Sequence, residues 1–338
     1  MTKQTYYLFM ILMIFSLAGC NQGAKQAIIE IPYKEYNHPV ILGDEMFINV
    51  NSDPSKLYDV DTLIQYNMKT GEEKVLYESE YEESAMQSTE VNEDWLVWVD
   101  SSVDGYYEKI LAMNLANGEI QTLGETNPEY LTLLSPSLYK EYVAWTQLND
   151  EMQVEVKLHN LETNETISVG NINEYSLYHA FVHLHDNKLL WTDSDNGNGY
   201  YYLYDLENKS TDKYQAPKRY PGYATYSNGK IFAIHFDNND WTMQDFGYLD
   251  LKTNEYHSLE HGQYINYFDS SNDRLAILDD EHHFYFYEFQ DDELVPLEVT
   301  FSQDINPGFI FFDPEGHLII YIDEEDDTDH SRVGVIYP

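Results

Sequence analysis

The chain has 338 residues and carries 60 Asp and Glu against 18 Lys and Arg, a formal net charge of −42. This excess argues against nucleic acid, anionic lipid and teichoic-acid-like polymers as electrostatic partners. A chain of this length can bury a large core, and its single cysteine rules out an intramolecular disulfide.

The N-terminal segment is typical of an export signal. Lys3 precedes an apolar run over residues 6–17, which is too short to cross a bilayer comfortably. Two small residues then lead directly to Cys20. This order resembles the bacterial lipoprotein signal, in which the cysteine becomes the lipidated first residue of the mature protein. An ordinary signal peptide with an incidental cysteine is the alternative.

These features predict how the chain is divided and where it is located. We expect a signal peptide over residues 1–19, a lipidated Cys20 with a short tether over 20–26, and one folded domain over 27–338. The protein would then be held by its lipid on the extracytoplasmic face of the cell membrane.

A polar residue marks the end of a predicted strand at intervals of about 40 to 50 residues, which is typical of propeller blades and similar arrays. The markers are Asn67, Asn114, Asn160, Asp205, Asp250 and Glu288. Four residues beyond them stand Gly71, Gly118, Asn164, Lys209, Asn254 and Asp292. Gly, Asn and Asp tolerate the positive φ of a tight hairpin, so only Lys209 departs from the expected turn chemistry.

A short apolar strand precedes each turn, and a seventh such strand follows the last one. The strands are predicted at 46–50, 95–99, 142–145, 189–191, 231–234, 275–278 and 318–322. Short runs rich in Val, Ile, Trp and Tyr between Asp, Asn and Gly indicate buried strands, and no long segment shows a helical period. The sequence therefore predicts an all-β protein.

The ends of the chain account for the seventh unit. The chain stops at Pro338, where the third strand of a seventh blade should end, and residues 27–33 can supply the missing fourth strand. Pairing the two ends would close a ring and cover an open sheet edge. We predict a seven-bladed β-propeller closed in this way; six-bladed and eight-bladed rings are the alternatives.

One blade resembles a known repeat. Asp193, Gly197, Asn198, Tyr201, Tyr202 and Asp205 are similar to the Asp-x-x-x-Gly-Asn-x-x-Ile-Tyr-x-x-Asp pattern of TolB-like propellers, which are related to WD40-like repeats. The resemblance implies the fold and an extracytoplasmic setting. It transfers no ligand, because the matching residues build turns.

Two acidic stretches are candidates for a cation. Asp193 and Asp195 begin a series like that of a calcium loop, although Gly197 holds the third acidic place, so a plain hairpin turn is the alternative. The second stretch contains Asp323, Asp326, Asp327 and Asp329 and is expected in a hairpin loop. It could bind calcium weakly or simply be solvated.

His183 and His185 lie on one side of a predicted strand and could hold zinc or manganese with a third ligand such as His235 or His317. The sequence requires no cofactor, and Ca²⁺ is the one candidate ion from its acidic loops.

No nucleophile elbow and no Gly-rich phosphate loop occurs, whereas aromatic residues make up 15% of the chain. We therefore expect a monomeric binding or scaffolding module whose blade loops contact a protein or a glycan. The alternatives are a polysaccharide-active enzyme, either lyase or glycosidase, with its site in the central channel, and a calcium-stabilised surface sensor.

Overall fold

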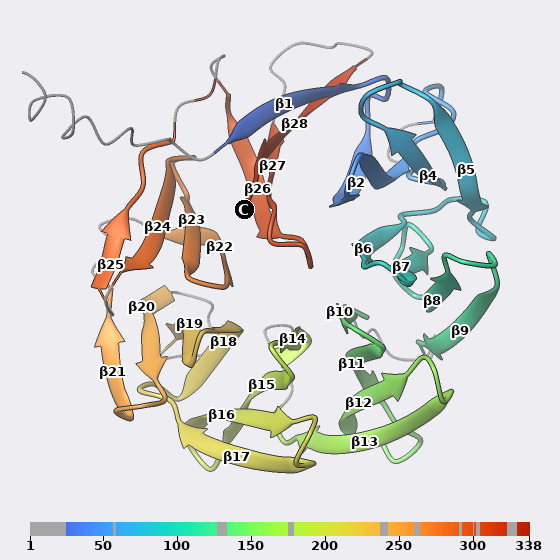
Figure 1. Ribbon diagram of the computed structural model, residues 1–338. Helices are drawn as coiled ribbons and strands as arrows, with labels where there is room; N and C mark the ends of the chain where they lie inside the picture. The colour runs from blue at the N-terminus through green and yellow to red at the C-terminus, as the bar shows by residue number, and fades with distance from the viewer. Residues whose placement is uncertain are drawn as a thin grey trace, which may run out of the picture.

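The structure is a computed structural model, and it describes residues 25–56, 59–126, 134–174, 179–236, 243–259, 264–290, 293–299, 301, 305–322 and 330–338. These residues form seven antiparallel sheets of four strands each, arranged as a ring around a central axis (Figure 1). No α-helix occurs among them. The predicted all-β, seven-bladed propeller is confirmed.

Each blade contributes one strand to each of four concentric layers (Figure 1). The innermost strands are β2 (Tyr36–Leu42), β6 (Gln87–Val91), β10 (Ser137–Tyr139), β14 (His183–His185), β18 (Tyr220–Ser227), β22 (Ile265–Ser271) and β26 (Pro307–Phe312). The second strands are β3 (Glu45–Val50), β7 (Trp95–Ser101), β11 (Tyr142–Leu148), β15 (Lys188–Asp195), β19 (Lys230–Phe236), β23 (Arg274–Asp279) and β27 (Leu318–Ile322).

The third strands are β4 (Thr62–Asn67), β8 (Glu108–Asn114), β12 (Val154–Asn160), β16 (Asn198–Asp205), β20 (Met243–Asp250), β24 (Phe284–Gln290) and β28 (Ser331–Ile336). The outermost strands are β5 (Glu73–Glu78), β9 (Ile120–Glu125), β13 (Glu165–Ile172), β17 (Ser210–Gln215), β21 (Glu255–Ser258), β25 (Glu293–Pro296) and β1 (Gln26–Ile31).

The core lies between the blades rather than within one of them. The second strands are buried almost throughout, because neighbouring blades cover both of their faces; every residue of β19 is buried. Trp98 packs with residues of blades one and two, and Trp145 packs between blades two and three. Burial on both faces explains why these strands show short apolar runs in the sequence instead of an alternating pattern.

The predicted turns are confirmed in five blades. The side-chain oxygens of Asn67, Asn114, Asn160, Asp205 and Asp250 accept hydrogen bonds from the amides two and three residues further on. The fourth residue beyond each has positive φ, and Lys209 adopts 52° at the same place as Gly118 at 73°. The side chain that caps the turn therefore fixes its backbone, even where a lysine must adopt a left-handed conformation.

The sixth turn differs from the prediction. Glu288 pairs with Arg274 in the register of the other markers, but β24 continues to Gln290, which pairs with Glu293. A shorter connection, residues 291–292, therefore replaces the capped turn; these two residues, and with them Asp292, lie outside the described residues.

The ring closes through the two ends of the chain. β1 pairs antiparallel with β28 over the register from Gln26↔Ile336 to Ile31↔Ser331, and the Tyr337 amide donates to the Lys25 carbonyl at 2.8 Å. The predicted closure is confirmed, although the strand ends at Ile31 rather than at Tyr33. Pro32 has no N–H to donate to the ladder, which explains the earlier end.

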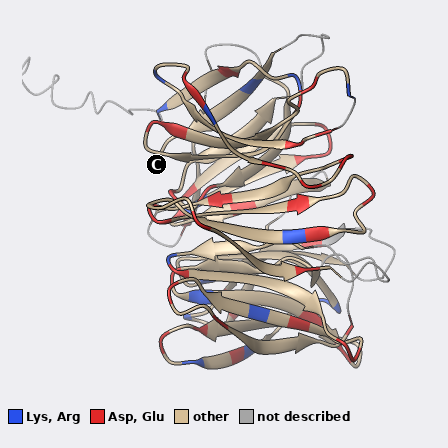
Figure 2. Cartoon of the chain, turned by 90° about the vertical axis from the view of Figure 1, so that its right-hand side faces the viewer, with Lys and Arg blue, Asp and Glu red and all other residues tan. Residues whose placement is uncertain are grey.

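Acidic residues lie on loops at both edges of the ring and along several strands, with few basic residues between them (Figure 2). Among the described residues, none forms a helix of the length and apolar character needed for a membrane span.

Candidate binding site in the central channel

A cavity of about 430 Å³ lies among the innermost strands, lined by residues of β2, β6, β10, β14, β18, β22 and β26 and of adjoining segments. This volume is within the range of about 300 to 1,000 Å³ that small-molecule sites occupy. Its lining draws on the innermost strands of all seven blades.

Aromatic rings form one side of this cavity. They come from blades four to seven: Phe181, Tyr223, Tyr267, Phe309 and Phe311. Phe181 meets Tyr223 edge to face at 5.6 Å between centroids, and Tyr267 meets Phe309 edge to face at 4.5 Å. Such contacts hold the rings in place, so this aromatic wall is already formed for an apolar surface or a cation.

Polar side chains form the side contributed by blades two and three. Ser88, Thr89 and Glu90 come from β6, and Ser135 and Ser137 lie at or just before the start of β10. The cavity therefore has an aromatic wall and, facing it, a wall of hydroxyls with one carboxyl group.

Hydrogen bonds join each blade to the next around the channel, and we call the side chains that make them the inner belt. The inner belt consists of Asn37, Glu90, Ser137, His183, Thr225, Asp269 and Asp313. In blades two to five the belt residue contacts the residue that follows the belt residue of the next blade, whereas Asp269 of blade six contacts Phe312, which precedes Asp313. One repeated position thus fastens the inner edge of the ring.

Most belt bonds are accepted from backbone amides. The Leu138 amide donates to Glu90 at 2.5 Å, and the Phe312 amide donates to Asp269 at 2.6 Å. The Ile41 amide donates to Asp313 at 3.1 Å across the junction of blades seven and one. These amides belong to inner strands that have no further strand toward the axis, so the belt supplies acceptors that the sheets lack.

Two belt carboxyl groups titrate near neutral pH. Burial raises the pKa of Glu90 to about 8, with a further contribution from the carboxylates of Asp269 and Asp313, although the Leu138 amide opposes the shift. Burial likewise raises the pKa of Asp269 to about 7 against the amides of Phe312 and Ser270. Glu90 keeps partial exposure because it borders the cavity, but protein surrounds it on its other sides.

The histidines predicted as metal ligands belong to this channel. His183 and His185 project from β14, with ring centroids 5.8 Å apart. Nδ1 of His183 accepts the Tyr226 amide at 3.0 Å, so the neutral ring carries its proton on Nε2. Burial lowers the pKa of His183 to about 3 and that of His38 to about 4, so both rings are uncharged at neutral pH.

The suggested third ligands lie elsewhere. His235 is hydrogen-bonded to the hydroxyls of Tyr201 and Tyr256, and His317 to the carboxylate of Asp313. Within the ranges that the structure describes, no group of three or more His, Cys, Asp or Glu is placed to hold a metal ion. A metal at His183 and His185 stays a prediction.

The first acidic stretch forms a strand and a tight turn. Asp193 and Asp195 both belong to β15, so the strand continues further than the sequence predicted, and only Asn196 and Gly197 form the turn, with φ of 51° and 82°. Asp193 is fully buried and accepts bonds from the amide and side chain of Asn173 at 3.0 and 2.6 Å. These donors give Asp193 a structural task, and calcium binding here stays a prediction.

The remaining predicted site residues cannot be placed. Asp323, Asp326, Asp327, Asp329 and the lipidation candidate Cys20 lie outside the described residues.

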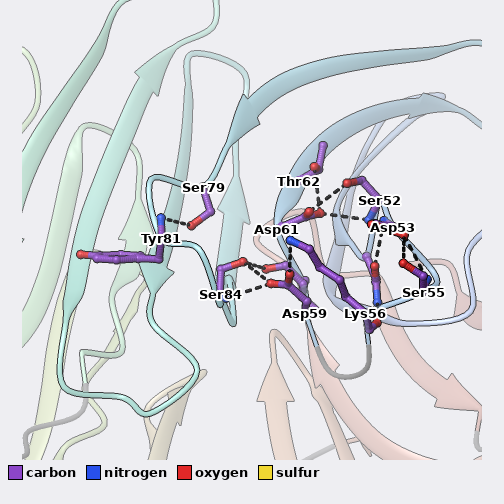
Figure 3. A network of polar contacts seen from close by, with 12 residues as sticks. Ser52, Asp53, Ser55, Lys56, Asp59, Asp61, Thr62, Ser79, Tyr81 and Ser84 are labelled. Carbon is purple, nitrogen blue, oxygen red and sulfur yellow. Dashed lines mark hydrogen bonds and ion pairs between the residues drawn. The ribbon is translucent and has the colours of Figure 1, made fainter.

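A second polar network joins blades one and two at their loops (Figure 3). Asp59 accepts bonds from the amide and hydroxyl of Ser84, both at 2.8 Å, and pairs with Lys56 at 2.9 Å. Burial opposes ionisation of Asp59, but the bonds from Lys56 and Ser84 outweigh it and lower its pKa. With all donors supplied by the chain, this network reads as a fastening between blades.

Glu90, Asp269 and the aromatic wall were missed by sequence reasoning. A usable signal exists: Glu90, Ser137, His183, Thr225 and Asp269 recur at about the blade period, each polar in the last few residues of an innermost strand. The innermost strands range from three residues in β10 and β14 to eight in β18, and this uneven length hides the recurrence.

Comparison with solved structures shows the fold. The chain is similar to the protein lmo1340 of Listeria monocytogenes (11% identity, 86% of this chain and 90% of that one, TM-score 0.54). It is also similar to the propeller domain of the trilobed protease of Pyrococcus furiosus, described as having an open velcro topology (13% identity, 72% and 78% coverage, TM-score 0.50). TolB of Acinetobacter baumannii also matches, with 14% identity, coverage of 76% and 65%, and a TM-score of 0.48.

The similarity to the Listeria protein and the Pyrococcus domain supports the propeller fold predicted from the repeat. This chain differs from the Pyrococcus domain in closing its ring through β1 and β28. No family model matches the chain, and no curated protein matches it.

Proposed function

We propose that the protein is a lipid-anchored binding protein on the extracytoplasmic face of a bacterial membrane, and that its ligand occupies the channel cavity. The observation that carries the proposal is the cavity itself: about 430 Å³, with fixed aromatic rings opposite hydroxyls and a carboxyl group. Pockets that are mostly apolar and hold a few convergent polar groups are the usual form of small-molecule sites. The propeller fold is consistent with a binding or scaffolding module.

The binding half is tested with a thermal-shift screen of cationic, neutral and anionic small molecules, because a ligand that binds only the native state raises the melting temperature. Hits are then measured on Ser135→Trp, which fills the cavity from β10's side, and on Thr122→Trp, which places the same bulk on the outer strand β9. We expect stabilisation to be lost in the first variant and kept in the second. Equal stabilisation of both variants, or no hit at all, contradicts the proposal.

The anchoring half rests on the sequence before the ring. The Lys25 carbonyl is held by the Tyr337 amide, so Asn21 to Ala24 would be the tether, with a reach of roughly 17 Å from Cys20 to Lys25 when extended. Metabolic labelling with a palmitate analogue should label the full chain and fail in Cys20→Ser. An unlabelled native protein, or a leader still attached at Cys20, contradicts anchoring.

One observation favours a second candidate, a polysaccharide-active enzyme. Glu90 and Asp269 are both channel carboxyl groups with raised pKa values, as a general acid requires. Turnover of an oligosaccharide by the native protein, abolished in Glu90→Gln and kept in the exposed-acid control Glu119→Gln, would establish this activity in place of simple binding.

A further inference from the structure

The charges around the channel cavity all have one sign. Its described lining includes the carboxyl groups of Glu90, Asp269 and Asp313 and contains no Lys or Arg. The histidines among the lining residues, His38, His183 and His185, have pKa values lowered by burial and add no positive charge at neutral pH. Near pH 8 and above, where Glu90 and Asp269 become ionised, an anionic ligand would meet uncompensated repulsion here, whereas a cation would find complementary charge.

The three carboxyl groups differ in how many of their oxygens already accept a hydrogen bond from the protein. Both carboxylate oxygens of Asp313 already have partners. Oδ2 accepts the Ile41 amide, and Nδ1 of His317 lies within hydrogen-bond distance of both Oδ1 and Oδ2. Asp269 accepts the amide of Phe312 on Oδ2 and that of Ser270 on Oδ1. Glu90 accepts the Leu138 amide on Oε2, and no residue in the described part of the chain donates to Oε1. Glu90 is therefore the belt residue with an acceptor left for a ligand.

The aromatic wall supplies a second and independent attraction for a cation. Aromatic faces attract ammonium groups through their quadrupoles, by about 0.5 to 2 kcal/mol or more where water is excluded. The same rings can cover an apolar body attached to that group. A hydrated metal ion would make no use of the aromatic rings. A neutral sugar could donate hydrogen bonds to the carboxylate but would leave its negative charge without a counter-charge.

Building on the binding role proposed above, we propose that the ligand is an organic ammonium ion, with its N–H groups donating to Oε1 of Glu90 and its apolar body lying against Tyr223, Tyr267 and Phe309. Binding is non-covalent. Where Glu90 is protonated beforehand, its O–H bond breaks and the proton passes to a solvent water or buffer base as the ammonium ion takes its place.

Three probes of one shape test the charge: phenethylammonium, 2-phenylethanol and phenylacetate, each titrated calorimetrically into the full folded domain near pH 8. We expect phenethylammonium to bind at least tenfold more tightly than 2-phenylethanol, and phenylacetate not to bind. If 2-phenylethanol or phenylacetate binds as tightly as the ammonium ion, the cation proposal is wrong while a channel binding role stands. If none of the three binds at millimolar concentration, the cation proposal is also overturned, and the broader screen decides on the binding role.

Glu90→Gln tests the contact. The amide oxygen can still accept the Leu138 amide, so the belt is kept while the charge is lost. We expect this variant to lose about tenfold or more in phenethylammonium affinity and to bind 2-phenylethanol as the native protein does. Glu119→Gln, an exposed acid beside β9, is the matched control and should change neither affinity. Equal affinity of Glu90→Gln and native protein for the ammonium ion would overturn the assignment.

The pH profile gives a readout that a structural role alone would not move. The titratable groups facing Glu90 are Asp269, Asp313 and Tyr223, with the three neutral histidines on the surrounding strands. Since the pKa of Glu90 is raised to about 8, the affinity for phenethylammonium should rise roughly tenfold or more between pH 6.5 and 8.5 as the carboxylate forms. A flat profile in the native protein contradicts the proposal.

Discussion

Two aspartates perform the same local task in opposite surroundings. Asp205 caps an outer turn of blade four, and Asp269 belongs to the inner belt of blade six; each accepts two backbone amides. The Lys188 ammonium and the turn amides lower the pKa of Asp205, which keeps partial contact with solvent, whereas burial raises the pKa of the enclosed Asp269 to about 7. Two amide donors do not keep a carboxylate ionised once water is removed and no cation replaces it.

The comparison separates two ways of building a ring. The outer turns organise single blades through side chains that keep contact with water. The inner belt joins different blades through side chains that are largely shielded from water. Substitutions in the belt should therefore have larger effects and the opposite pH dependence.

The largest effect is expected for Asp269→Ala, which leaves the buried amides of Phe312 and Ser270 without an acceptor. Near pH 5 we expect a loss of about 3 kcal/mol in the free energy of unfolding, measured by urea denaturation. Asp212→Ala, an exposed acid on β17, should change it by less than about 0.5 kcal/mol. Equal losses of unfolding free energy in the two variants would contradict the distinction between the inner belt and the exposed outer strands.

The belt carboxyl group should also reverse the usual pH dependence. Because the folded-state pKa of Asp269 is raised above its unfolded value, the folded protein binds the extra proton, and this contribution to stability is lost as pH rises from about 4 to about 7. Asp269→Asn should remove that decline, which amounts to about 4 kcal/mol for a pKa raised from 3.8 to about 7, in denaturation curves recorded across the range. Asp205→Asn should remove a contribution of the opposite sign, one that is lost as pH falls. Identical pH profiles for all three proteins would contradict the assigned surroundings.

A smaller loss is expected for Asn114→Ala at an outer turn. It removes the acceptor for the amides of Ala116 and Asn117, which water can replace, so we expect about 1 kcal/mol. Thr122→Ala on the neighbouring outer strand is the control. A loss as large as that of Asp269→Ala would show that exposure does not decide the effect.

The smallest effect, and a gain, is expected for Lys209→Gly. Lys209 adopts a φ of 52°, which costs a residue with a side chain more than it costs glycine, so the variant should gain about 0.5 kcal/mol in thermal unfolding. The reverse change, Gly118→Ala at φ 73°, should lose about 1 kcal/mol, although no atom lies within 4 Å of the added Cβ. A loss in Lys209→Gly would show that its lysine side chain contributes more than the backbone strain removes.

The outer turns and the blade count could be predicted from the sequence because the residues that form each turn are close together in the chain. A capping Asn or Asp, the residue four places on, and an apolar second strand all lie within one blade, so Asn67 to Asp250 could be aligned and the ring counted. The closing strand could be predicted because the last blade lacked a partner for β28.

The channel could not be predicted in the same way. Glu90 accepts the amide of Leu138 from the next blade, and its pKa is raised mainly by burial, with a smaller contribution from Asp269 of blade six. Phe309 likewise faces Tyr267 of another blade. Such contacts depend on how blades converge at the axis. The three-residue strands β10 and β14 also offered too little pattern to fix their register.

The pairing of β1 with β28 makes assembly sensitive to whether synthesis has reached β28. Six complete blades separate the two strands along the chain, so β1 must wait, unpaired, until all of them have been made. A product cut short before Ser331 keeps an uncovered ladder on Gln26–Ile31 and a gap in the circle, both of which invite aggregation or proteolysis. Closure of the ring therefore distinguishes molecules that contain β28 from shorter products.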